Sequence, residues 1–300
     1  MKKQVLALAV MVLAAGGAFA QANDTLAKIK STGAVTMGVR DSSGALAYTI
    51  GDGKYVGFHT EMSERILADI QKQLGLPKLD IKRQLVTSQN RVPLVQNGTV
   101  DLECGSTTNN ATRQKDVAFA ITTYVEEVRI AVKANSGINS IKDLNGKNVV
   151  TTTGTTSVQT LRKNERAQGI DFKEVMGKDH ADSFLLLETG RADAFVMDGS
   201  ILAANISKAK DSAAFKIVGP ELSVEPIACM VRKDDPAFTK AVNESIARQI
   251  KDGSLAKLYD KWFMQPIPPT NKALNLPLSD ATKAAWASPN NKPMEDYVKK

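Results

Sequence analysis

Short apolar strands alternate with amphipathic helices along almost the whole chain. The predicted strands cover residues 35–39, 79–85, 100–103, 127–132, 147–150, 172–175, 194–197, 215–218 and 227–231. The predicted helices cover residues 59–73, 90–96, 156–167, 183–189, 200–209, 236–251 and 254–262. Apolar residues in these helices recur every three to four positions, so they share one side of the helix. This alternation predicts an α/β fold with mostly parallel sheets.

Residues 1–20 are typical of a cleavable secretory signal peptide. Lys2 and Lys3 form a basic start, residues 5–15 are apolar, and residues 18–20 (AFA) match a cleavage site. The apolar stretch is too short to span a bilayer. We therefore expect a soluble, exported, periplasmic protein.

The charged residues are dispersed and mixed in sign, although the 300-residue chain has a formal net charge of +7. Because no basic block is interleaved with aromatic residues, we expect no nucleic-acid partner. With only His59 and His180, no cluster of Cys and His has the spacing of metal ligands. We expect no metal, no cofactor and a monomeric chain.

Cys104 and Cys229 are the two cysteines of the chain. In an oxidising compartment a single pair favours one disulfide, although the two residues are far apart in the sequence. The alternative is a pair of buried thiols.

Residues 101–113 (DLECGSTTNNATR) predict a buried strand, a turn rich in hydroxyls and amides, and a helix start that carries Arg113. A helix N-terminus with free backbone N–H groups, flanked by hydroxyls and a guanidinium, is a site for a carboxylate. This motif predicts that the protein binds a small acidic molecule and does not cleave it.

Three further segments place small polar residues after a predicted strand, namely residues 40–43, 87–91 and 151–157. Each set of hydroxyls taken alone is explained by helix capping. Four such segments in one chain favour a shared anion site.

Arg40, Arg91 and Arg113 all lie at these turns, so a common cleft would need negative charge from its ligand. An acidic amino acid supplies two carboxylates and one ammonium group. Asp198, at the end of a predicted strand, is then a natural acceptor for the ammonium group. His180 can donate to a carboxylate, and its alternative is an exposed loop histidine.

A faint internal similarity relates residues 94–103 to residues 187–195. In both, a helix ends at a glycine and an aspartate follows three positions later, before a buried strand. Two similar lobes of this kind would place a ligand between them. From Gln265 the chain is rich in Pro, Asn and Lys, and we expect an extended tail with a short helix near 279–286 that either wraps a lobe or projects from it.

Enzyme motifs are sparse. Residues 254–257 (SLAK) match the S-x-x-K spacing of penicillin-recognising enzymes, but the companion motifs are missing, and we treat the match as chance. His180 and Glu103 are the candidates for an acid or base. They leave open a dehydratase-like enzyme that acts on cyclic acids.

Several motifs resemble those of the periplasmic solute-binding proteins of polar amino-acid ABC transporters (solute-binding protein family 3), in particular those that bind glutamate and aspartate. The resemblance extends from about residue 26 to about residue 269. Its most specific segments are 87–94 (TSQNRVPL), 103–110 (ECGSTTNN), 154–157 (GTTS), 178–180 (KDH) and 229–236 (CMVRKDDP).

The resemblance implies a type II periplasmic binding protein fold with two α/β lobes joined by two hinge strands. Lobe 1 would comprise residues 26–126 and 228–300, and lobe 2 residues 127–227. Cys104 and Cys229 would then both lie in lobe 1, where a disulfide is sterically reasonable.

The resemblance also implies a role for each candidate residue. The α-carboxylate of the ligand would be held by Ser106, Thr108, Arg113, Thr155, Thr156 and Ser157. The α-ammonium group would be held by Asp198, and the side-chain carboxylate by Arg40, Ser88, Arg91 and His180. The protein would capture glutamate or aspartate by hinge closure and deliver it to an ABC transporter permease without covalent chemistry. The alternatives are a receptor for another polar amino acid such as glutamine, or the dehydratase-like enzyme.

Overall fold

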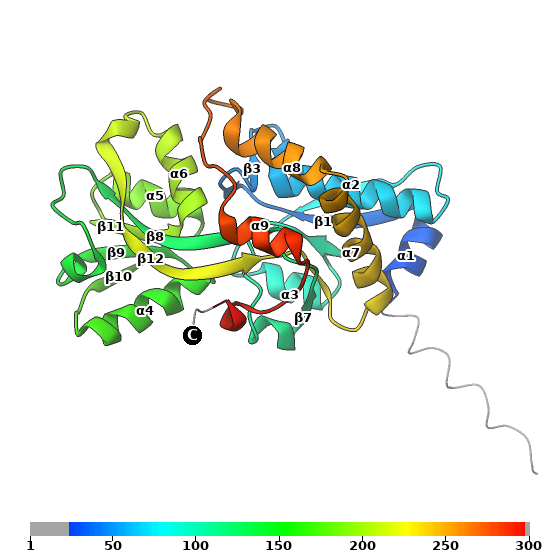
Figure 1. The fold of residues 1–300 in the computed structure, drawn as a ribbon, viewed down its shortest axis with the longest axis horizontal. Coiled ribbons are helices and arrows are strands. Elements are labelled where there is room, and N and C mark those ends of the chain that lie inside the picture. Colours follow the sequence, from blue (N-terminus) through cyan, green and yellow to red (C-terminus); the bar gives the residue numbers. More distant parts are fainter. Residues whose placement is uncertain (1–23, 298–300) are drawn as a thin grey trace, which may run out of the picture.

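The computed structural model describes residues 24–297 and places two five-stranded sheets next to each other along the long axis of the molecule (Figure 1). The first sheet has the order β5 (Asp80–Leu85), β1 (Ala34–Val39), β6 (Leu102–Glu103), β13 (Met230–Arg232) and β7 (Val117–Phe119). The second has the order β10 (Lys173–Gly177), β9 (Asn148–Thr152), β11 (Ala194–Asp198), β8 (Tyr124–Lys133) and β12 (Phe215–Ile227). We call the parts around these sheets lobe 1 and lobe 2. The predicted signal peptide lies outside the described residues.

Helices cover both sheets. Lobe 1 carries α1 (Thr25–Thr32), α2 (Phe58–Gln73), α3 (Arg91–Gln96), α7 (Pro236–Lys251), α8 (Ser254–Tyr259) and α9 (Asp280–Ala287). Lobe 2 carries α4 (Thr156–Gln168), α5 (His180–Glu188) and α6 (Gly199–Lys208). Local sequence explains several helix starts. For example, the side chain of Asp235 accepts a hydrogen bond from the Phe238 N–H at the start of α7, and Pro236 lies in its first turn.

Two long strands connect the lobes. β8 and β12 pair antiparallel from Tyr124 and Ile227, at the end nearest lobe 1, to Lys133 and Phe215 in lobe 2. A register shift between Val218 and Ser223 interrupts the ladder. Figure 1 shows both strands passing from one lobe into the other.

The two-lobe α/β fold is therefore confirmed, but each sheet is mixed and not mostly parallel. β1 pairs parallel with β5 and β6, whereas β13 pairs antiparallel with β6 and β7. In lobe 2, β9 pairs parallel with β10 and β11, and β8 runs antiparallel to β11 and β12. The antiparallel halves arise because the chain enters and leaves lobe 2 in opposite directions.

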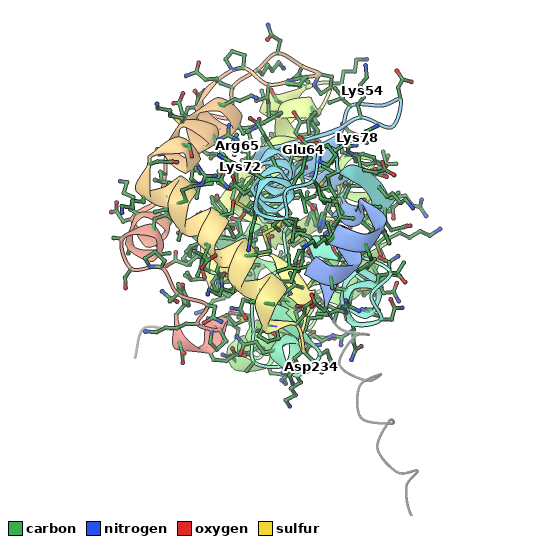
Figure 2. The ribbon with its side chains drawn as sticks, turned by 90° about the vertical axis from the view of Figure 1, so that its right-hand side faces the viewer. Lys54, Glu64, Arg65, Lys72, Lys78 and Asp234 are labelled. Atoms are coloured by element: carbon green, nitrogen blue, oxygen red, sulfur yellow. A yellow bond between two sulfur atoms is a disulfide. The ribbon has the colours of Figure 1, made fainter. Side chains whose placement is uncertain are left out.

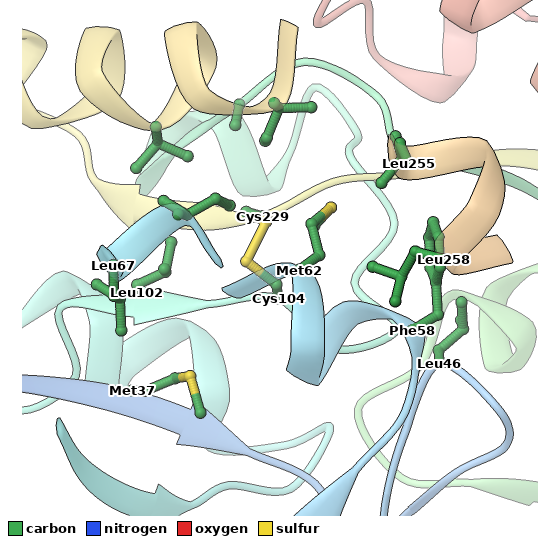
Figure 3. Close-up of a cluster of buried hydrophobic side chains, with 14 of the residues drawn as sticks. Met37, Leu46, Phe58, Met62, Leu67, Leu102, Cys104, Cys229, Leu255 and Leu258 are labelled. Carbon is green, nitrogen blue, oxygen red and sulfur yellow. A yellow bond between two sulfur atoms is a disulfide. The ribbon is translucent and has the colours of Figure 1, made fainter. Parts of the chain in front are cut away.

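The predicted disulfide is confirmed. Cys104 and Cys229 are bonded, with their Cα atoms 4.2 Å apart, and both are buried among apolar side chains of lobe 1 (Figure 3). Met62 of α2 and Leu102 of β6 lie in the same core. Charged residues such as Lys54, Lys72 and Asp234 instead lie on the outside of this lobe (Figure 2).

Sequence patterns missed a small sheet formed by β2 (Ser42–Ser43), β3 (Ala47–Thr49) and β4 (Tyr55–Val56). The C-terminal tail, up to residue 297, packs on lobe 1 and on the first connecting strand. The Val125 N–H donates to the Thr282 hydroxyl (3.0 Å), and the Trp286 ring N–H donates to the Thr123 carbonyl (2.9 Å). Within the described residues, no helix is long and apolar enough to cross a membrane.

Candidate functional site

The candidate ligand-binding residues gather where the two lobes face each other, and most of them follow the carboxyl ends of strands. Arg40 follows β1, Ser88 and Arg91 follow β5, Ser106 and Thr108 follow β6, Thr155 to Ser157 follow β9, His180 follows β10 and Asp198 ends β11. All are buried except Arg113 and Thr156, which are partly buried. This arrangement is the general one for ligand sites in α/β proteins.

Arg40 of lobe 1 contacts lobe 2 directly. Its Nη2 donates to the Ser88 hydroxyl (3.0 Å) and lies 3.3 Å from His180 Nε2 and 3.6 Å from the Asp179 carboxylate. Burial and the charge of Arg40 lower the pKa of His180 to about 3, so this imidazole is neutral at pH 7. The Nε and Nη1 atoms of Arg40 are buried and have no hydrogen-bond partner within residues 24–297.

Arg91 begins α3 and is 1% exposed. Its Nε and Nη1 atoms are also buried without a hydrogen-bond partner in the described part of the chain. Burial, together with repulsion from Arg40 and Arg113, lowers the pKa of the Arg91 guanidinium. We call Arg40, Ser88, Arg91 and His180 the arginine cluster. Its unpartnered N–H groups are suited to an anion.

The helix predicted at Arg113 is wrong, because residues 113–115 form only a short 3₁₀ turn before β7. The Asn110 side chain accepts from the Arg113 N–H (2.8 Å) and shapes this turn. Arg113 donates to the carbonyls of Thr108 (2.8 Å) and of Gly154 in lobe 2 (3.2 Å). The motif therefore supplies a guanidinium at the cleft but no helix N-terminus.

The helix N-terminus next to the Arg113 contact is that of α4, which follows Gly154. Its N-cap residue, Thr155, makes no side-chain capping bond, and the Thr155 hydroxyl donates to the Thr152 carbonyl (2.7 Å). The Ser157 hydroxyl is buried and has no partner among the described residues. This leaves the first turn of α4 suited to a carboxylate.

Gly154 lets the turn before α4 approach lobe 1. Its φ is +81°, and a Cβ there would lie 2.6 Å from the Gln89 Cα. Further contacts between the lobes are made by the Ala181 N–H, which donates to the Ser42 hydroxyl (3.2 Å), and by Lys208 Nζ, which lies 4.3 Å from the centre of the Tyr48 ring. The two lobes are thus in contact around the site.

Carboxylates surround the other side of the site. Asp198 is 2% exposed, and its Oδ1 atom has no hydrogen-bond partner in the described residues. Burial, together with the charges of Glu126 and Glu225, raises the pKa of Asp198. An ammonium group beside Asp198 would pair this carboxylate.

Sequence patterns missed Glu126 and Glu225, which lie directly opposite each other on β8 and β12. Glu126 accepts hydrogen bonds from the hydroxyl and N–H of Ser200 at the start of α6. Burial raises the pKa of Glu126 to about 7, and the charge of Glu225 contributes to the shift. We call Glu126, Asp198 and Glu225 the carboxylate cluster.

Glu225 constrains two of the candidate hydroxyls. Its Oε2 atom accepts from the hydroxyls of Thr108 (2.5 Å) and Thr156 (2.6 Å). Both hydroxyls donate to this atom, so each threonine uses its single hydroxyl proton on Glu225. A ligand carboxylate at these two residues would therefore have to accept from their backbone N–H groups. The hydroxyl of Ser106 likewise donates within the protein, to Ser43 (3.0 Å).

The site combines buried donors that lack an acceptor with a buried carboxylate that lacks a donor. A small zwitterion with an additional negative charge would satisfy both. Among the described residues no group of three or more His, Cys, Asp or Glu side chains could hold a metal ion.

Comparison with known proteins agrees with this geometry. The family model described as bacterial extracellular solute-binding proteins, family 3, matches residues 35–265. A glutamate/aspartate import solute-binding protein of Salmonella typhimurium is 43% identical, with 97% of this chain and 98% of the relative covered. An L-glutamate/L-aspartate-binding protein of Pseudomonas aeruginosa is 44% identical over 90% of each chain. Among solved structures, an ancestral arginine-binding protein bound to glutamine has a TM-score of 0.68 at 29% identity and covers 77% of this chain and 98% of that chain.

Proposed function

This chain belongs to family 3 of the bacterial extracellular solute-binding proteins, and we propose that it captures L-glutamate and L-aspartate in the periplasm for an ABC importer. The type II periplasmic binding protein fold provides two lobes with the ligand site between them. The protein binds and releases its ligand unchanged, as a solute-binding protein and not as an enzyme.

One observation carries the choice of an acidic ligand. Two arginines, Arg40 and Arg91, are each 1% exposed and keep N–H groups without a partner in the described residues. Arg40 has an ion pair with Asp179 at 3.6 Å, but no carboxylate in the described residues pairs with Arg91, and a buried guanidinium without a counter-ion is costly. A side-chain carboxylate bound by Arg40, Arg91, Ser88 and His180 removes that cost, whereas a neutral amide does not.

The α-amino and α-carboxylate groups have complementary partners. We assign the ammonium group to Asp198. The α-carboxylate is assigned to Arg113, to the first turn of α4 at residues 155–157, and to the segment of Ser106 and Thr108. These roles follow the charges at the site, because the hydrogen-bond donors for the carboxylates and the acceptor for the ammonium group lie on different elements.

Capture requires the lobes to separate and close. We propose that the hinge lies on β8 and β12, with lobe 1 comprising residues 26–126 and 228–300 and lobe 2 residues 127–227. Closure brings residues 154–157 against Arg113, and His180 against Arg40. The closed complex is the form that an inner-membrane permease receives, and the protein serves it as a monomer after removal of residues 1–20.

Isothermal titration of the purified chain with L-glutamate, L-aspartate, L-glutamine and L-histidine tests this function. We expect glutamate and aspartate to bind one per chain, and glutamine to bind at least about a hundredfold more weakly because its amide leaves buried guanidinium charge uncompensated. Tight binding of glutamine without binding of glutamate contradicts the proposal. Recovery of the amino acid unchanged after incubation separates binding from turnover.

A further inference from the structure

Glu225 is a fully buried carboxylate on β12, two residues before the end of the strand that returns to lobe 1. The chain segment that carries Thr108 is fixed beside it. Thr108 forms a bridge with Ile227, and the Asn109 N–H donates to the Pro226 carbonyl (2.8 Å). The position of Glu225 relative to lobe 1 is thus set by backbone pairing.

The same carboxylate also contacts lobe 2. Oε2 accepts from the hydroxyl of Thr156, the first residue of α4, at 2.6 Å, and Oε1 accepts from the Ser223 hydroxyl at 2.8 Å. One oxygen atom therefore receives hydrogen bonds from hydroxyls on both sides of the cleft. Thr108 Oγ1 and Thr156 Oγ1 lie only 3.2 Å apart.

This geometry exists only while the lobes are together. If α4 moves away from lobe 1, the two hydroxyls separate, and a single oxygen atom cannot remain within hydrogen-bond distance of both. Opening therefore breaks at least one of the two hydrogen bonds that this oxygen atom accepts.

We propose that Glu225 is a positioning residue that latches the two lobes in the closed form, through Thr108 on one side and Thr156 on the other. It does not contact the ligand. It slows the release of the ligand by stabilising closure, so it deepens the proposed function and rests on it.

If Glu225 latches the closed form, its substitution should change the two rate constants of binding differently, which is not expected if Glu225 only stabilises the fold. The ligand enters the open form, in which the latch is already broken, so loss of the latch should raise the dissociation rate constant and leave the association rate constant nearly unchanged. We expect Glu225→Met, which removes all acceptors at similar size, to raise the dissociation rate of L-glutamate roughly tenfold or more in stopped-flow measurements. Glu225→Gln keeps one carbonyl oxygen for the two threonines and an amide that can donate to Ser223, so it should restore slow release.

Matched controls separate the latch from nonspecific damage. Glu221→Met changes an exposed glutamate of the same strand and should leave both rate constants unchanged. Thr156→Val should raise the dissociation rate, whereas Thr189→Val, at an exposed position of lobe 2, should not. Because Thr156 acts through Glu225, the double variant Glu225→Met/Thr156→Val should release ligand about as fast as Glu225→Met alone. Thr156→Val also carries the test if Glu225→Met does not fold.

Three results would overturn the latch: equal changes in association and dissociation, a Gln variant as fast as the Met variant, or additive effects of the two substitutions. Titration of the unaltered chain decides the proposed function independently. If the unaltered chain binds none of the panel amino acids, small-angle scattering tests the latch without ligand. Glu225→Met should then have a larger radius of gyration than the unaltered chain, and equal radii reject the latch.

Discussion

The arginine cluster and the carboxylate cluster occupy the same cleft but satisfy their buried charges differently. Arg40 and Arg91 keep N–H groups without an acceptor in the described residues, and repulsion from Arg40 acts on Arg91. Glu126 and Glu225, in contrast, are hydrogen-bonded by Ser200, Ser223, Thr108 and Thr156. Within the carboxylate cluster, Asp198 alone retains an oxygen that has no partner in the described residues.

This difference suggests a division of roles, in which one set of residues binds the ligand and the other controls the relative position of the lobes. The groups at the cleft that keep an unpartnered buried atom, such as the two arginines, Ser157 and Asp198, are those to which a ligand can supply the missing hydrogen bonds. The two glutamates on the connecting strands already have hydrogen-bond partners, and we expect them to fix the positions of the lobes and their helices. The predictions below test this division.

The largest effect is expected for Arg91→Met. Affinity for L-glutamate should fall by about 2–5 kcal/mol, since a buried carboxylate loses its partner. The free energy of unfolding of the ligand-free chain should rise by about 1–4 kcal/mol, because an unpaired buried charge is replaced by an apolar side chain. Titration calorimetry and urea denaturation measure the two changes. Arg83→Met, which removes an exposed ion pair with Glu64, should change neither by more than about 1 kcal/mol. A less stable Arg91→Met chain would contradict the division.

Asp198→Asn should have the next largest effect. Affinity for L-glutamate should fall by about 1.5–3 kcal/mol, because the ammonium group loses a charged acceptor. The ligand-free chain should become more stable at pH 7, since a neutral amide replaces a buried carboxyl group whose pKa is raised by burial and by the charges of Glu126 and Glu225. Titration calorimetry and thermal unfolding check both, with the exposed Asp171→Asn as the control. Unchanged affinity would remove Asp198 from the ligand site.

The two clusters should also give opposite pH dependences of stability. The pKa of His180 falls from 6.5 to about 3, so its contribution to stability is present above pH 6.5 and is lost as the pH falls toward 3. The pKa of Glu126 rises from 4.5 to about 7, so its contribution is present below pH 4.5 and is lost as the pH rises toward 7.

Denaturation of ligand-free variants between pH 4.5 and 6.5 measures these slopes. Relative to the unaltered chain, His180→Gln should make stability rise less steeply with pH, and Glu126→Gln should make it fall less steeply. If both substitutions change the slope of stability against pH in the same direction, the two clusters do not have opposite pH dependences.

The smallest effect is expected for Lys208→Met, which removes a contact between the lobes that belongs to neither cluster. The ammonium group of Lys208 lies over the Tyr48 ring, and such a contact contributes about 0.5–1 kcal/mol at an exposed position. Affinity for L-glutamate should weaken by no more than about fivefold in titration calorimetry. A loss of affinity as large as that of Asp198→Asn would show that the contact between Lys208 and Tyr48 contributes as much to binding as the residues of the two clusters.

Much of the fold and part of the site follow from local sequence. The helix at 236–251 has the predicted bounds, and the disulfide pair was identified from two cysteines in an exported chain. Arg40, Arg91 and Asp198 are predicted as ligand-binding residues because each lies at the end of a strand pattern or the start of a helix pattern, and His180 is predicted as a donor to a ligand carboxylate.

Glu126 and Glu225 could not be recognised in this way. The strand predicted at 127–132 begins at Tyr124, and the strand predicted at 215–218 continues to Ile227, so both glutamates lay outside the predicted strands. The pairing of Glu126 with Glu225 is a contact between strands nearly a hundred residues apart, and no local pattern encodes that register. The one available signal was a single acidic residue within the apolar segment 224–228.

The bond between Cys104 and Cys229 closes a covalent ring of chain, with a sequence separation of 125 residues. All of lobe 2 and both connecting strands lie within this ring. A peptide bond cut anywhere between the two cysteines therefore leaves the fragments linked, and they part only after reduction. In the periplasm, a protease that nicks an exposed loop of lobe 2 would damage the receptor without dividing it.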